Sequence, residues 1–185
     1  MTALSSPDKL EELVAREEIR DLIYRYSHAI DRRDWALLDT IFWPDGQVEY
    51  GLYDDRAGGF TPVVKKVYAD TRIHITQHFI GNCILRVRGD RAEGETYVQA
   101  LHRVPDGSGS HYDLLMGSRY IDTFERRQDE WRIRFRKVAF DWLRQFADSG
   151  DWTVGAFGIK RGAGHIAEPE IERWVQIQEL LDLER

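Results

Sequence analysis

Two side chains that are far apart in the sequence have the types needed for acid–base chemistry. Asp31 falls at the end of a predicted amphipathic helix over about 7–32, and His78 falls on a predicted strand over 73–88. A carboxylate that holds one ring nitrogen of a histidine fixes the tautomer and leaves the other nitrogen as a general base. Together the two residues would remove a proton from a small molecule.

Each residue also has a structural explanation. The helix dipole disfavours an anion at the position of Asp31 by about 0.3–1 kcal/mol. Asp31 could instead cap the next helix or pair with Arg32 or Arg33. His78 could be a core histidine that hydrogen-bonds a backbone carbonyl. From the residues alone, both explanations stay open.

Further polar side chains have the same two kinds of explanation. His102 lies on a strand face that is otherwise small or apolar, so it is either structural or a second acid–base group. The phenols of Tyr26 and Tyr50 can hydrogen-bond a carbonyl oxygen as negative charge develops on it. Tyr26 is also simply a member of the apolar stripe of its helix.

Two more candidates lie on strands. Asn82, on the predicted face of His78, either donates to a substrate oxygen or satisfies the backbone. Arg136 alternates with Arg132 and Arg134, so it either reaches the pocket or belongs to a solvated basic face.

Patterns for metal and phosphate sites are missing from the sequence. His74 and His78 are four apart on a strand, which separates their side chains by roughly 13 Å, too far to share a metal. No Gly-rich phosphate loop and no nucleophile elbow occurs. We therefore expect no cofactor and no metal.

The elements that must position these residues change character along the chain. A short helix capped by Asp34 follows the first one, then a strand at 45–51, a loop from 54 to 59, and a helix opened by Thr61 and Pro62. The period then becomes two, which predicts strands at about 73–88, 92–104, 111–127 and 130–143. Helices followed by an antiparallel meander indicate an α+β domain.

The last part of the chain has a different composition. Residues 144–168 contain five glycines and predict an irregular flap, and 169–185 predict a final amphipathic helix. We expect residues 1–143 to form the main α+β body and 144–185 to be a flap and helix of the same domain. Trp142, beside the flap, would close the pocket mouth or reach a neighbouring subunit.

The composition is typical of a soluble globular protein. Hydrophobic residues are 42% and charged residues 31%, and the formal charge of −6 argues against nucleic-acid or anionic-membrane partners. No apolar run approaches the roughly 18 residues of a membrane span. Cys83 is the single cysteine, which excludes an intrachain disulfide; with no signal peptide, this favours the cytoplasm.

Three segments, in this order, resemble the SnoaL-like family of the nuclear transport factor 2-like superfamily. They are YRYSHAIDRRDW at 24–35, FWPDGQVEY at 42–50 and HITQHFIGN at 74–82. The resemblance implies a cone-shaped α+β fold, in which N-terminal helices pack on a curved antiparallel or mixed sheet around one pocket.

The resemblance also implies a site. Asp31 and His78 match the pair shared by the family's catalytic members. His102 is similar in position to a second histidine of the scytalone dehydratase relatives. Tyr26 and Tyr50 are spaced like tyrosines of the bile-acid dehydratase relatives.

The remaining members of the implied site bind substrate. Arg136 lies at about the place of a pocket arginine in the hexachlorocyclohexane dehydrochlorinase relative. Asn82 would add a polar contact, and Phe42, Val98 and Trp142 would form apolar walls.

The implied function is a cofactor-independent lyase, dehydratase-like, acting on a hydrophobic cyclic or polycyclic molecule such as a steroid or polyketide. An isomerase or cyclase remains an alternative. So do a non-catalytic subunit resembling ring-hydroxylating dioxygenase β subunits and a ligand-binding module. Apolar residues expected on the outer sheet face predict a dimer or trimer. They are Phe79, Cys83, Leu85, Val87, Tyr97, Leu101, Leu115 and Ile121.

Overall fold

The computed structural model describes residues 6–51, 53–56, 59–71, 73 and 75–147, and the structural statements below concern these residues. The flap expected over 144–168 and the helix expected over 169–185 lie outside them, except for 144–147. Within the described part, none of the helices has the length and apolar character that crossing a membrane requires.

The described chain folds into helices and strands close to those expected. The helices are α1 (Ser6–Arg32), α2 (Trp35–Asp39) and α3 (Phe60–Thr71). The strands are β1 (Phe42–Tyr50), β2 (Tyr53–Arg56), β3 (Ile75–Arg88), β4 (Arg91–Pro105), β5 (His111–Arg127) and β6 (Glu130–Ala147). Strand β2 includes residues 54–56 of the loop expected at 54–59, and β6 runs past the boundary expected after 143.

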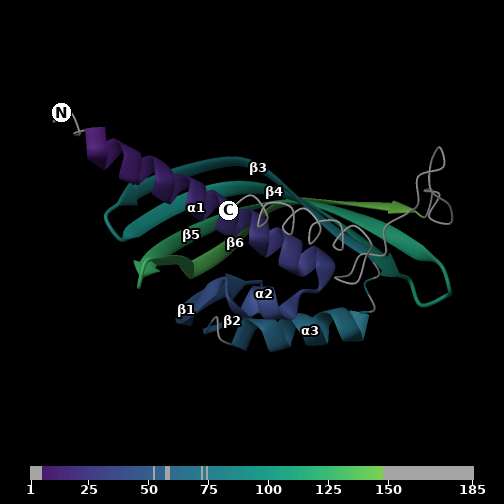
Figure 1. The fold of residues 1–185 in the computed structure, drawn as a ribbon. Helices are drawn as coiled ribbons and strands as arrows, with labels where there is room; N and C mark the ends of the chain where they lie inside the picture. Colours follow the sequence, from purple (N-terminus) through teal and green to yellow (C-terminus); the bar gives the residue numbers. More distant parts are fainter. Residues whose placement is uncertain (1–5, 52, 57–58, 72, 74, 148–185) are drawn as a thin grey trace, which may run out of the picture.

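The six strands form one open, mixed sheet in the order β2-β1-β6-β5-β4-β3 (Figure 1). All neighbours are antiparallel except β1 and β6, which are parallel. Strand β2 was not predicted from the sequence. The strand is short and polar, with Asp54 and Asp55, and it pairs only with β1. Such an edge strand carries no hydrophobic alternation by which it could be recognised.

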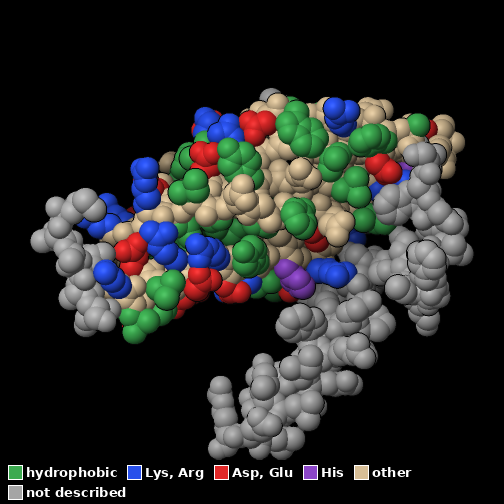
Figure 2. Space-filling model, turned by 90° about the horizontal axis from the view of Figure 1, so that it is seen from above, with side chains coloured by type: hydrophobic (Ala, Val, Ile, Leu, Met, Phe, Trp, Pro, Cys, Tyr) green, Lys and Arg blue, Asp and Glu red, His purple; other side chains and the backbone are tan. Residues whose placement is uncertain are grey.

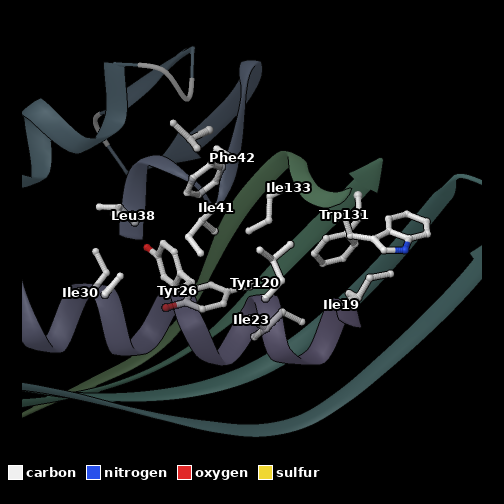
Figure 3. Close-up of a cluster of buried hydrophobic side chains, with 14 of the residues drawn as sticks. Ile19, Ile23, Tyr26, Ile30, Leu38, Ile41, Phe42, Tyr120, Trp131 and Ile133 are labelled. Carbon is white, nitrogen blue, oxygen red and sulfur yellow. The ribbon is translucent and has the colours of Figure 1, made fainter. Parts of the chain in front are cut away.

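The core lies between α1 and the sheet. Residues of α1 at helical spacing, including Ile19, Ile23 and Tyr26, are at most 1% exposed. They pack among buried sheet side chains such as Tyr120 and Ile133 (Figure 3). Asp34 caps α2 as expected, accepting a hydrogen bond of 3.0 Å from the backbone nitrogen of Leu37. This short helix connects α1 to β1.

A bulge in β3 changes which side chains face the helix. It lies between Ile80 and Cys83, where β3 has one more residue than β4. An extra residue reverses the alternation of faces along a strand. The expectation that Cys83, Leu85 and Val87 lie on the outer face is therefore wrong, because Leu85 is 3% exposed in the core and the other two pack against it.

A second bulge lies in β6, where Arg134 is the extra residue between Ile133 and Phe135. It places Ile133 and Arg136 on the same core face, and both are 0% exposed. The alternative that Arg136 belongs to a solvated basic face is therefore wrong.

The opposite face of the sheet exposes apolar side chains. Phe79 is 71% exposed and Tyr97 50% exposed, as expected for outward positions of β3 and β4, and Ile121 of β5 is 36% exposed. Figure 2 shows apolar side chains gathered among charged ones on the face seen from above. This surface is consistent with the expected dimer or trimer, which stays a prediction.

The β3 bulge predicts opposite effects for two neighbouring residues. Leu85→Ala should lower the free energy of unfolding by about 2–5 kcal/mol because it opens a cavity in the core. Ile84→Ala is the matched control: its side chain is 68% exposed, so a change within about 0.5 kcal/mol is expected. Urea unfolding measures both, and equal costs for the two variants would contradict the assigned register.

Candidate functional site

The carboxylate of Asp31, one residue before the end of α1, is held by β3. Thr76 Oγ1 donates to Asp31 Oδ1 at 3.0 Å, and the backbone nitrogen of His78 donates to Oδ2 at 2.8 Å. Nδ1 of His78 lies 2.6 Å from Oδ1. The contact expected between the two side chains is present. Asp34, not Asp31, caps the next helix, so that alternative for Asp31 is wrong.

These contacts set the charge of the pair. Burial alone would raise the pKa of the Asp31 carboxyl, but the hydrogen bonds and charge of His78 outweigh burial and leave the pKa below its ordinary value. An ionised carboxylate accepts only, so Nδ1 of His78 carries a proton and donates it. When the imidazole is not protonated at both nitrogens, Nε2 is the nitrogen that can accept a proton.

His102 on β4 adjoins this pair. The antiparallel register pairs Thr76 with His102 and His78 with Ala100, so the two histidines lie diagonally on one face. Their ring centroids are 5.6 Å apart in an edge-to-face arrangement. Burial, assisted by the charge of His78, lowers the pKa of His102 to about 4. A neutral His102 near pH 7 donates one ring N–H and accepts at the other nitrogen.

Thr76 and Tyr68 support Asp31, and neither residue was expected to have a role in the site. The Tyr68 hydroxyl donates to Thr76 Oγ1 at 3.4 Å, and Thr76 in turn donates to Asp31. Burial raises the pKa of Tyr68, so its phenol stays protonated and can donate. Thr76 could have been found from its place two residues before His78 on the same strand face. Tyr68 had no such signal, because only folding brings α3 to β3.

A second polar group lies under α1. It contains Tyr26, which is 1% exposed, and Tyr50, which is 36% exposed. Burial raises the pKa of both phenols, and the charge of Arg136 opposes this. Of the two tyrosines, Tyr50 keeps surface that a ligand can reach, while Tyr26 is enclosed by core residues, Phe42 among them.

Arg136 is buried beneath these tyrosines and forms an ion pair with Asp122 of β5. Its Nε and Nη2 donate to the two carboxylate oxygens of Asp122 at 2.8 and 2.7 Å. Its guanidinium lies 4.2 Å from the ring centroid of Tyr26 and 4.0 Å from that of Tyr120. The expectation of substrate contact by Arg136 stays a prediction, and in this structure its side chain is 0% exposed.

Of the other expected substrate contacts, Val98 lies on the strand face of the histidines, whereas Asn82 and Trp142 do not join them. Asn82 is exposed at the β3 bulge, which ends the alternation on which its placement beside His78 depended. Trp142 is 40% exposed and its indole lies against the backbone of Gly117. Val98 and Phe42 are buried core residues, 4% and 5% exposed. Their roles as pocket walls stay predictions.

A surface hollow lies elsewhere, toward the β3–β4 turn, and contains none of the expected catalytic residues. It is lined by Arg86, Val87, Arg88, Arg91, Ala92, Glu93, Thr123, Phe124 and Glu125. Among the described residues, no cluster of three or more His, Cys, Asp or Glu side chains is arranged to hold a metal ion.

The chain is similar to proteins of known structure. A hexachlorocyclohexane dehydrochlorinase from Novosphingobium barchaimii shares 23% identity, with a TM-score of 0.68, over 76% of this chain and 95% of that one. A candidate scytalone dehydratase from Novosphingobium aromaticivorans shares 19% identity, with a TM-score of 0.64, over 84% and 95%. At these identities the likeness shows the fold.

Sequence comparison agrees with this fold. An uncharacterised protein of Mycobacterium tuberculosis is 32% identical over 124 residues, which is 66% of this chain and 82% of that protein. The model of the SnoaL-like domain matches residues 11–137.

The lowered pKa of Asp31 predicts a pH-dependent contribution to stability. Because the folded-state pKa lies below 3.8, the carboxylate stabilises the fold above that pH, and the contribution is lost as the pH falls through the folded-state pKa. Asp31→Asn should lower the free energy of unfolding by about 1–3 kcal/mol near neutral pH. The difference from the unmodified protein should shrink in acid.

Asp39→Asn is the control for this measurement, because it removes an exposed carboxylate at the end of α2. Denaturant unfolding across a pH series measures both variants. The same pH dependence in Asp31→Asn as in Asp39→Asn would contradict the assignment.

Proposed function

Because this chain belongs to the SnoaL-like family, we propose that it is a cofactor-independent lyase, dehydratase-like, acting on a hydrophobic cyclic or polycyclic molecule. The observation that carries the proposal is the 2.6 Å contact between Asp31 and His78, which directs one imidazole nitrogen away from the carboxylate as a base. The similar structures support elimination, since a dehydrochlorinase and a candidate dehydratase are among them.

The first step is removal of a proton from the carbon next to a carbonyl group. Nε2 of His78 takes this proton. The electron pair of the broken carbon–hydrogen bond delocalises into the carbonyl group, which gives an enolate. The ionised Asp31 stabilises the imidazolium that results, while Thr76 and Tyr68 keep the carboxylate in place. An aspartate held by three hydrogen bonds needs little reorganisation as charge develops beside it.

The second step expels the leaving hydroxyl from the β carbon. The enolate electrons form the carbon–carbon double bond as the carbon–oxygen bond breaks. His102 donates a ring proton to the departing oxygen, and the proton held by His78 replaces it, so water leaves and both histidines return neutral. Tyr50 hydrogen-bonds the enolate oxygen in the intermediate.

The substrate class follows from the surroundings of the histidines. Their strand neighbours Val98 and Ala100 are apolar and buried. Such a site favours a cyclic apolar skeleton of the steroid or polyketide kind, with a carbonyl and a hydroxyl group. We further propose a cytoplasmic homo-oligomer whose partners are small molecules and not nucleic acids.

Proton removal can be tested with a panel of hydroxytetralones whose hydroxyl is β to the carbonyl. In heavy water they should exchange the α proton and lose water to form a naphthol, and proton NMR measures both reactions. We expect His78→Gln and Asp31→Asn to slow both by roughly a hundredfold to ten-thousandfold. His28→Gln, which changes an exposed histidine of α1, should leave the rates unchanged.

The outcome also separates the alternatives. Exchange without loss of water would contradict a dehydratase and favour an isomerase or cyclase. Binding with neither reaction would contradict an enzyme and favour a ligand-binding module or a structural subunit.

Tyr50 is expected to act after proton removal has begun. Tyr50→Phe should slow naphthol formation by about tenfold to a thousandfold, because the enolate oxygen loses its donor. Tyr24→Phe, at a 53% exposed tyrosine of α1, is the control. Equal rates for Tyr50→Phe and the unmodified protein would remove Tyr50 from the mechanism.

A further inference from the structure

Apolar side chains continue from the two histidines across the sheet to β6. Residues that pair directly on neighbouring strands lie on the same face of a sheet. The strand register places four residues in one such row, from β3 to β6: His78, Ala100, Met116 and Leu143. The row therefore begins at the proposed base and ends on the last strand of the chain's meander.

A further bulge in β6 adds a second aromatic residue to this face. Phe140 and Leu143 are three apart, so regular alternation would place them on opposite faces. Because Asp141 is an extra residue relative to β5, both side chains lie on the face of the histidines. Trp142 lies on the other face, with its indole against Gly117.

Phe140 and Leu143 are open to contact with a ligand. They are 60% and 48% exposed, whereas Val98 and Tyr120 on the same face are core residues. Figure 1 shows that β4, β5 and β6 continue beyond the C-terminal end of α1, so the helix covers the core but not this end of the sheet. Exposed apolar side chains beside a few polar groups are typical of a ligand-binding surface.

The length of the row indicates the size of the ligand that can use it. Neighbouring strands lie about 4.8 Å apart, so the three spacings between β3 and β6 amount to roughly 14 Å. A bicyclic molecule with its carbonyl group at His78 would end before it reached Leu143. A skeleton of three or four fused rings would extend to β6.

We propose that Met116, Phe140 and Leu143 are specificity-determining residues that bind the apolar part of an elongated substrate. The reacting carbonyl group lies on a terminal ring, beside His78, and the rest of the skeleton lies across β4, β5 and β6. Met116 suits this role because its unbranched side chain adapts to an irregular apolar surface. This inference rests on the proposed function, because that function places the carbonyl group at the histidines.

The test measures binding without turnover. Equilibrium dialysis compares two ketones that lack a leaving group, tetralone with two fused rings and androstanone with four. We expect androstanone, with its carbonyl on a terminal ring, to bind at least about tenfold more tightly. Leu143→Asn should weaken the binding of androstanone about tenfold, because an apolar contact is lost, and should change that of tetralone by less than about twofold.

Phe146→Asn is the matched control. Phe146 is an exposed apolar residue of the same strand, but the register places it on the opposite face from Leu143. This substitution should leave the binding of both ketones unchanged. Phe140→Asn is a second test variant, and it should weaken the binding of androstanone as Leu143→Asn does.

Several results would overturn the proposal. They are failure of androstanone to bind, equal weakening of both ketones in Leu143→Asn, and equal effects of Leu143→Asn and Phe146→Asn on androstanone. A lower urea midpoint for Leu143→Asn would also overturn it, because the chain itself would then pack on Leu143.

The binding test and the hydroxytetralone assay fail separately. If the hydroxytetralones react and androstanone shows no preference over tetralone, this inference is wrong and the proposed function stands. If the hydroxytetralones neither exchange a proton nor lose water, the proposed function is wrong, whatever the ketones show.

Discussion

Helix α1 covers an open sheet, and the polar side chains beneath it must find partners inside the protein. Two carboxylates meet this constraint in different ways. Asp31 is satisfied by donors of β3, and these hydrogen bonds join the end of the helix to that strand. Asp122 is satisfied by the guanidinium of Arg136, which in turn lies against the tyrosine that α1 contributes. The hydrophobic packing of α1 is thus tied to the sheet at two polar points.

The two points have different electrostatic surroundings. Burial acts to raise the pKa of both carboxyls, but His78 outweighs it at Asp31, where the pKa lies below the ordinary value. At Asp122 burial prevails over Arg136 and the pKa is raised. Environments that separate similar groups in this way are a feature of sites for acid–base chemistry. Here they place an ionised carboxylate beside the histidines and a cation beside the tyrosines.

This division fits the elimination proposed for the protein. Proton removal needs a base with a stabilised conjugate acid, and Asp31 beside His78 supplies that. The enolate needs a donor for its oxygen, and burial raises the pKa of the Tyr50 phenol, which keeps its proton available to donate. The fold itself does not select this chemistry, because one fold hosts many activities. The proposed lyase activity therefore depends on the residues of the site.

The sequence by itself determined the residue types, the helical and strand periods and the order of the elements. These features were enough to predict an α+β fold with α1 packed on a sheet, because amphipathic periodicity depends on residues that are close together in the sequence. They were also enough to single out Asp31 and His78, since an acid at a helix end and a histidine on a strand can be recognised from the sequence. The family resemblance supplied the expectation that the two meet.

The tertiary structure decided everything that depends on register. Two bulges reversed the alternation of β3 and β6, moving Leu85 and Arg136 into the core. A bulge is one extra residue relative to a partner strand, so a strand read alone cannot show it. The pairing of Arg136 with Asp122 and the support of Asp31 by Tyr68 also could not be predicted from single elements. They join residues of separate elements, and only packing determines which of their side chains meet.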